Sequence, residues 1–197
     1  MLRKQQTEQS LLTPAALQRD EPTEAVVAVW DPLVRIFHWS LVVGFIAAYA
    51  SGDEWDLFHE FVGYVILTLL AIRILWGFIG SRHARFSNFL YRPRTVLKFL
   101  RSSIRFEAPR YLGHNPAGGA MVIALLMAVI GICVTGIFLT TETYGHVKWL
   151  EELHEMLANG TIVLIVLHIC GVVLASIEHK ENLVTAMFTG KKRPQDR

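Results

Sequence analysis

The class of this chain follows from the stretch HEMLANGTIVLIVLHICGVVLASI, residues 154–177. It contains no lysine or arginine, and Glu155 is its only acid. A helix needs about 20 apolar residues to cross the roughly 30 Å hydrocarbon core of a membrane, so the stretch predicts a transmembrane helix. Residues 33–50, 59–79 and 118–140 have the same character and predict three more spans.

The composition agrees with a membrane protein. Of the 197 residues, 52% are hydrophobic, and the mean hydropathy is +0.37, which is too apolar for an ordinary soluble domain of this length. We therefore expect an all-α integral membrane protein with a four-transmembrane-helix bundle in residues 29–192. A polar, loosely ordered tail (1–28) without an evident signal peptide is expected before it, and a short basic tail (193–197) after it.

The charges of the loops predict the orientation. Segment 81–117 carries eight arginines and lysines against a single acid, and segment 180–197 is also basic. The two other connections, near residues 53–56 and 142–152, are acidic, with Lys148 as their only lysine or arginine. Since positive charge is retained in the cytoplasm, both termini and the long middle loop are expected there, in a multi-pass protein of the bacterial inner membrane.

Within the middle loop, residues 93–106 fit an amphipathic helix. Its apolar residues share one face, and its bases lie elsewhere: Val96, Leu97, Leu100 and Ile104 against Arg94, Lys98, Arg101 and Arg105. Two interpretations remain open. The segment is either a surface helix lying on anionic lipid or a basic loop that only sets the topology.

Four of the eight histidines lie within or at the edges of the expected spans: His38, His59, His154 and His168. An ionisable side chain in a membrane is costly and suggests function, although a single one is more often hydrogen-bonded to a neighbouring helix. These four sort into two layers. His38 and His168 lie toward the cytoplasmic side, and His59 and His154 lie at the outer side.

The spacing in the fourth span suggests what the histidines hold. His154 and His168 are separated by about 21 Å along a helix and differ by only about 40° around it, so both face the bundle. Two stacked haems would each need two such ligands, and the natural pairs are His38 with His168 and His59 with His154. Bis-histidine ligation leaves no open iron position, which favours electron transfer. The sequence contains no Cys-x-x-Cys-His motif, so b-type, non-covalent haems are expected.

Other residues near these layers each have two interpretations. Gly63, one turn from His59, either leaves room for a macrocycle or packs against a neighbouring helix. Arg73 lies 14 residues after His59, at the depth of the inner haem. It either pairs with a haem propionate or a quinone site, or extends to the membrane surface, and Arg35 has the same two interpretations. His114 and Asn115 lead into the third span, where a quinone head group could sit.

Several runs together resemble bacterial cytochrome b561 and the b-type cytochrome subunits of nickel hydrogenases. They are WDPLVRIFHW (30–39), HEFVGY (59–64), GFIGSRHARF (77–86), LGHNPAGG (112–119) and LHE (153–155). The resemblance covers about residues 29–192 and implies a four-helix, di-haem, quinone-linked protein with ligands on spans one, two and four. His38, His59, His154 and His168 match that ligand pattern. The N-terminal tail is longer than this family would suggest.

The leading functional hypothesis is an electron conduit across the bilayer. It would join the quinone pool to a periplasmic partner, either a cytochrome c or a hydrogenase-like redox subunit. Membrane lipid is the other expected contact, a homo-oligomer is compatible with the sequence, and no nucleic acid is expected. The sequence leaves open whether the chain is a carrier or part of an oxidoreductase.

Two alternatives remain open. A stand-alone superoxide:quinone oxidoreductase would favour a cationic outer face, but only Lys148 and His146 are found there. A non-redox transporter or proton channel would favour broken helices or acids in mid-span, and neither is evident.

Overall fold

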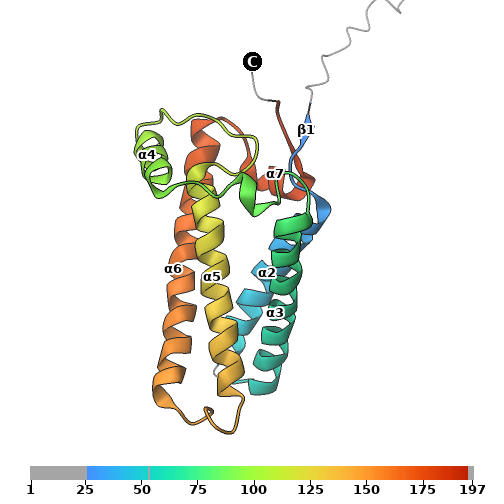
Figure 1. Ribbon diagram of the computed structural model, residues 1–197, viewed down its shortest axis with the longest axis vertical. Coiled ribbons are helices and arrows are strands. Elements are labelled where there is room, and N and C mark those ends of the chain that lie inside the picture. Colours follow the sequence, from blue (N-terminus) through green and yellow to red (C-terminus); the bar gives the residue numbers. More distant parts are fainter. Residues whose placement is uncertain (1–25, 53, 195–197) are drawn as a thin grey trace, which may run out of the picture.

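The computed structural model describes residues 26–52 and 54–194, and four long helices dominate it (Figure 1). They are α2 (Pro32–Ser51), α3 (Asp56–Ile79), α5 (Pro116–Leu139) and α6 (Lys148–Glu178). Each is long and apolar enough to cross a membrane. The prediction of an all-α membrane protein with four spans is therefore confirmed.

The helix bounds lie within three residues of the predicted spans except at the start of α6, which begins at Lys148 rather than at His154. The added residues, Lys148–Leu153, include two acids and a tryptophan. Such residues are unsuited to the hydrocarbon core but are accommodated at the membrane interface. Hydropathy therefore located the apolar part of the helix and missed its interfacial turns.

Two spans begin with the same local device. Asp31 caps α2, its Oδ1 accepting from the Val34 backbone N–H at 2.9 Å, and Asn115 caps α5, accepting from the Gly118 N–H at 2.7 Å. A proline follows each cap at the first helical position, where its missing N–H costs nothing. The second carboxylate oxygen of Asp31 also accepts from Trp76 Nε1 at 3.1 Å and from the Ser81 hydroxyl. Asp31 therefore joins the start of α2 to the end of α3.

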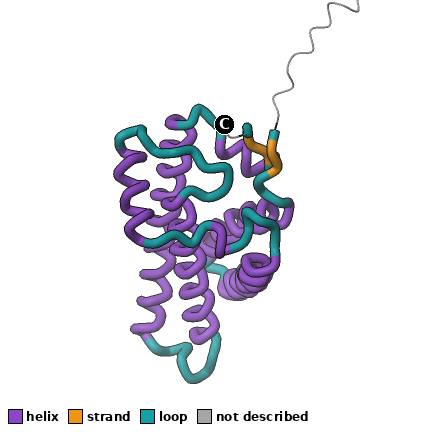
Figure 2. Tube along the Cα trace, turned by 45° about the horizontal axis from the view of Figure 1, so that its top comes forward, coloured by secondary structure: helices purple, strands orange, loops and turns teal. Residues whose placement is uncertain are grey.

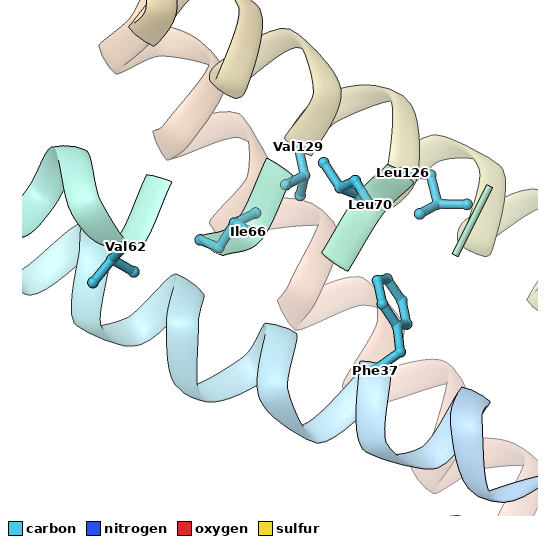
Figure 3. Packing of buried hydrophobic residues seen from close by; sticks show 6 residues of the cluster. All are labelled: Phe37, Val62, Ile66, Leu70, Leu126 and Val129. Atoms are coloured by element: carbon cyan, nitrogen blue, oxygen red, sulfur yellow. The ribbon is translucent and has the colours of Figure 1, made fainter. Parts of the chain in front are cut away.

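The spans pack as two antiparallel hairpins, α2 with α3 and α5 with α6, joined mainly where α3 meets α5. Figure 3 shows the buried cluster at this junction, formed by Phe37, Val62, Ile66, Leu70, Leu126 and Val129. Many outward-facing residues are large and apolar, such as Ile36 and Phe78, which are 65% and 70% exposed. Such a surface suits contact with lipid tails, because an apolar side chain exposed to lipid tails does not carry the free-energy cost that it carries in water.

The long connection between α3 and α5 lies at the same end of the bundle as both ends of the described chain (Figure 2). It contains a short 3-10 turn, η2 (Phe86–Asn88), and the predicted amphipathic helix, α4 (Pro93–Ile104). Within the described part of the chain, the opposite end holds the two short connections. This arrangement places the basic segments at one end and the acidic connections at the other.

The first and last described segments of the chain pair with each other. Strand β1 (Val27–Ala28) pairs antiparallel with β2 (Lys191–Lys192), directly after the short helix α7 (Leu183–Thr189). The prediction of a loose tail up to residue 28 was therefore too long by at least these two residues, because a two-residue strand leaves no hydrophobic pattern to detect. The rest of that tail, residues 1–25, lies outside the described residues, as do residues 195–197.

Candidate haem-binding sites

The outer pair of histidines meets across the bundle. His59, in the first turn of α3, and His154, in the second turn of α6, have ring centroids 6.0 Å apart and nearly perpendicular planes. Two imidazoles on opposite sides of one metal ion, each nitrogen about 2 Å from it, place their ring centres roughly 6 Å apart. The spacing of this pair suits bis-histidine ligation.

Hydrogen bonds fix the tautomer of each outer ring. His59 Nδ1 lies 2.9 Å from the Ala48 carbonyl oxygen, which can only accept, so Nδ1 donates. The Thr135 hydroxyl lies 2.9 Å from the Gly131 carbonyl oxygen and 3.0 Å from that of Ile132. With its proton donated to its own helix, as is common for threonine in a helix, its oxygen accepts from His154 Nδ1 at 2.9 Å. Each ring therefore keeps its free lone pair on Nε2. Histidines that bind metals usually donate their other N–H in this way.

A cavity open on one side lies beside the outer pair, with walls from all four spans. Most of its lining is apolar, and both His59 and His154 border it. Gly63 also lines it, and a Cβ added there would meet no atom within 4 Å. The structure thus places Gly63 at open space, as a macrocycle beside His59 would require.

The inner pair repeats the arrangement at the other end. His38 of α2 and His168 of α6 have ring centroids 6.4 Å apart, with planes tilted by 55°. Since α6 is unbroken, the two pairs are separated by roughly 21 Å along its axis. The structure therefore brings together the same histidine pairs that the sequence predicted.

Buried polar atoms without a hydrogen-bond partner concentrate at the inner end. Among the described residues, five such side-chain atoms occur: Arg35 Nε, His38 Nδ1, Trp39 Nε1, Arg73 Nη1 and His114 Nδ1. All belong to the region where α2 and α5 begin and α3 ends. Because buried polar groups are almost always satisfied, this concentration fits a polar or charged group bound there, such as the propionates of a haem.

Arg73 is deeply buried, with only 3% of its surface exposed, so it does not extend to the membrane surface. One nitrogen, Nη2, donates to the Ala84 carbonyl at 3.2 Å, and the guanidinium lies 5.0 Å from the centre of the Phe86 ring. The other terminal nitrogen has no partner among the described residues. A buried cation with a free donor is suited to an anionic partner.

Arg35 and Asn115 are already engaged in structural contacts. Arg35 Nη1 donates to the Phe188 carbonyl at 2.8 Å and so ties α2 to α7. The Asn115 side-chain oxygen caps α5. Neither contact was foreseen from the sequence. Arg35 Nε, which is buried and has no partner among the described residues, remains for a ligand, as does the Asn115 amide nitrogen.

His114 lies between two aromatic rings, 4.6 Å from Trp30 and 4.5 Å from Phe89 between ring centroids. Burial lowers the pKa of His114 to about 3, and the charges of Arg73 and Lys192 act in the same direction. The ring is therefore neutral at physiological pH. Its buried Nδ1, which has no described partner, is available to one hydrogen-bonding group.

Sequence reasoning missed Thr135, which orients His154, and Trp30, which covers His114. Thr135 is one polar residue in an apolar span, and such threonines often bond their own helix. Gly44 packs on Ile66, since an added Cβ would lie 3.2 Å from that side chain. Gly160 and Gly171 face open space.

Two nitrogen donors are too few for a bare metal ion, but haem iron takes four more from its macrocycle, so each pair needs nothing else from the chain. Besides its two nitrogens, the outer site has histidine rings held in one tautomer and an adjoining cavity. The inner site has buried hydrogen-bond donors without a partner among the described residues. The residues present therefore fit haem at both ends.

Comparison with known proteins points the same way. The sequence profile of the prokaryotic cytochrome b561 family matches residues 29–190. A probable Ni/Fe-hydrogenase B-type cytochrome subunit of Bradyrhizobium diazoefficiens is 26% identical, covering 92% of this chain and 94% of the relative. A protein of the same description from Azotobacter vinelandii is 24% identical, and the match covers 88% of this chain and 91% of the relative. One from Rhodobacter capsulatus is also 24% identical, and its match covers 86% of this chain and 82% of the relative. No solved structure shows a significant match.

The profile match spans most of the chain and contains all four spans and all four paired histidines. The chain therefore belongs to the prokaryotic cytochrome b561 family and is a b-type, haem-binding electron-transport protein with four helices in the bacterial inner membrane.

Proposed function

We propose that the chain binds two b-type haems and carries electrons across the bilayer between a redox partner at the periplasmic face and the quinone pool. His38 and His168 would hold the inner haem, and His59 and His154 the outer one. The observation that carries the proposal is the pair of matched ring separations, 6.4 Å and 6.0 Å, at opposite ends of one bundle.

The chain's own residues would hold these groups rigidly. The Ala48 carbonyl and the Thr135 hydroxyl fix the outer rings so that each offers Nε2. At the inner end, Arg73 and the other unpartnered donors would bind the acidic groups of the cofactor or the substrate. When bound, haem iron supplies reversible one-electron transfer without an open coordination position.

The inner end is the proposed place for quinone. The neutral His114, held between Trp30 and Phe89, offers Nδ1 to a quinone carbonyl beside the Arg73 guanidinium. Arg73 and His114 each have a buried nitrogen without a partner among the described residues at this end of the bundle. Asn115 adds only its amide nitrogen, because its oxygen caps α5.

The outer end is the proposed place for the protein partner. Its connections carry exposed acids such as Glu54, Glu142 and Glu151, and the positive-inside rule places them in the periplasm, with both chain termini in the cytoplasm. The relatives are named as hydrogenase cytochrome subunits, which favours a hydrogenase-like redox subunit. A basic cytochrome c is the electrostatic alternative.

No observation favours the other functions that were weighed. The four spans are continuous helices, and each of their acids lies within the first three turns of its helix or is its last residue. Lys148 and His146 are the only bases in the acidic outer connections, which gives little attraction for superoxide.

Proteoliposomes would test the conduit. A short-chain quinol is added to vesicles containing the full chain, and haem reduction is followed by absorbance together with haem content. The proposal expects rapid reduction in the wild type. It expects His38→Ala to keep the outer haem but to lose its reduction by quinol. Equally fast reduction of the remaining haem in His38→Ala would contradict an inner-to-outer relay.

A further inference from the structure

Helix α4 is fixed beside the end of a membrane span. Phe99 and Ser103 are its buried residues, and the helix packs against α5 and α6. The Ser103 hydroxyl donates to Glu178 Oε2 at 3.4 Å, and the Ala108 N–H donates to Glu178 Oε1 at 2.7 Å. Because Glu178 is the last residue of α6, these contacts hold α4 at the level where that span leaves the membrane.

Three different faces run along α4. At 3.6 residues per turn, Phe99 and Ser103 define the face packed on the bundle. A second face carries Leu97, Leu100 and Ile104, which the described residues leave 52%, 43% and 74% exposed. The third face lies about a quarter turn farther round and carries only bases: Arg94, Lys98, Arg101 and Arg105.

The basic face has no counter-charge of its own. Among the described residues, none of its four side chains forms a hydrogen bond or an ion pair. They border a surface hollow together with Leu97, Ser102 and Glu107, and Glu107 is the only acid there. Four unpaired bases beside one acid form a site for anions.

We propose that α4 is an interfacial helix that binds anionic phospholipid. Its apolar face enters the acyl region beside α6, and its four bases bind lipid phosphates at the membrane surface. The order of the three faces around α4 supports lipid as the ligand. One face is held by the bundle, and the apolar and basic faces lie next to each other, about 90° apart around the helix axis. A helix lying at the membrane surface requires this arrangement, because its apolar face must meet the acyl chains while its basic face meets the phosphates. A soluble protein partner would not need the apolar face at the level of a span end.

Hydrogen exchange of residues 93–104 tests this in the full chain, reconstituted in nanodiscs of phosphatidylcholine with or without phosphatidylglycerol. We expect exchange to slow by roughly tenfold when phosphatidylglycerol is present at low salt, and the protection to shrink as salt rises. This comparison uses the wild-type protein alone, so it does not depend on a variant that folds. It is also independent of haem and of the proposed redox function.

A variant pair assigns the effect to the basic face. The quadruple variant R94Q/K98Q/R101Q/R105Q should lose the lipid-dependent protection. The control R82Q/R92Q/K180Q/K191Q removes the same charge from exposed bases at the same end of the bundle and should keep it. Identical exchange in both lipids for the wild type, or equal loss in both variants, would overturn the proposal, as would protection that appears only with an added soluble protein.

Discussion

The imidazoles of His59 and His154 lie 6.0 Å apart, and each has its Nδ1 already occupied, by a backbone carbonyl in one case and by a threonine hydroxyl in the other. The two remaining nitrogens belong to different hairpins of the bundle. A ligand that joins them would therefore also join the hairpins.

Thr135→Val should weaken the outer haem site. The variant keeps the shape of the side chain but removes the acceptor that orients His154, and loss of such a partner typically costs 10–100-fold in metal affinity. Haem retention during dilution in detergent, followed by absorbance, would measure the loss. Thr161→Val is the control, because the equally buried Thr161 hydroxyl bonds only the Leu157 carbonyl of its own helix. Equal retention in both variants would remove Thr135 from the site.

Arg73→Leu should lower the midpoint potential of the inner haem, because the loss of a nearby positive charge disfavours the reduced state. A tenfold change in a one-electron equilibrium corresponds to about 60 mV, and a shift of this order is expected. A potentiometric titration measures it. Arg73→Lys keeps the charge and should recover part of the shift, whereas Arg82→Leu, at an exposed position of the same end, should change nothing. Unchanged potentials in Arg73→Leu would place the haem elsewhere.

His114→Phe should impair quinone turnover but leave haem content unchanged. Phenylalanine preserves the ring between Trp30 and Phe89 but removes the hydrogen-bonding nitrogen, so KM for a quinol should rise by about tenfold. His146→Phe, in the exposed outer connection, should behave as the wild type. If His114→Phe retains the wild-type KM, quinone does not use this ring.

Glu181→Gln should destabilise the junction of the chain ends. Glu181 is buried and accepts from Arg110 at 2.9 Å and from the Arg193 N–H at 3.2 Å, and Lys192 lies 3.8 Å away. Loss of charged hydrogen bonds of this kind costs about 2 kcal/mol. Thermal unfolding in detergent at pH 7 would show the loss, and Glu142→Gln, in an exposed connection, would serve as the control.

The same carboxyl predicts an acid dependence. Burial alone would raise the pKa of Glu181, but the Arg110 hydrogen bond and the Lys192 and Arg110 charges outweigh it, and the pKa lies below its usual value. Its stabilising contribution is therefore complete above the unfolded pKa of about 4.3 and is lost as the pH falls through the lower folded value. The wild type and Glu181→Gln should converge in stability toward acid pH. A constant difference between them down to the lowest pH would contradict this.

The sequence predicted the spans and the histidine pairs because each depends on a feature that can be measured along the sequence. Hydropathy defines a span, and the 14-residue interval between His154 and His168 fixes two ligands on one face of α6. Arg73 was harder to interpret, because sequence alone does not distinguish an arginine buried against Phe86 from one that reaches the surface. Thr135, Trp30 and the carbonyl of Ala48 act through contacts between separate helices, and such contacts appear only once the helices are packed.

Haem content distinguishes two histidine-bound haems from one. A pyridine haemochrome assay on the purified chain, set against protein concentration, should give close to two non-covalent b haems per chain. His168→Ala should give close to one, with the spectrum of the outer haem retained. One haem in the wild type, or loss of only the outer haem in His168→Ala, would contradict the two histidine pairs on which this account depends.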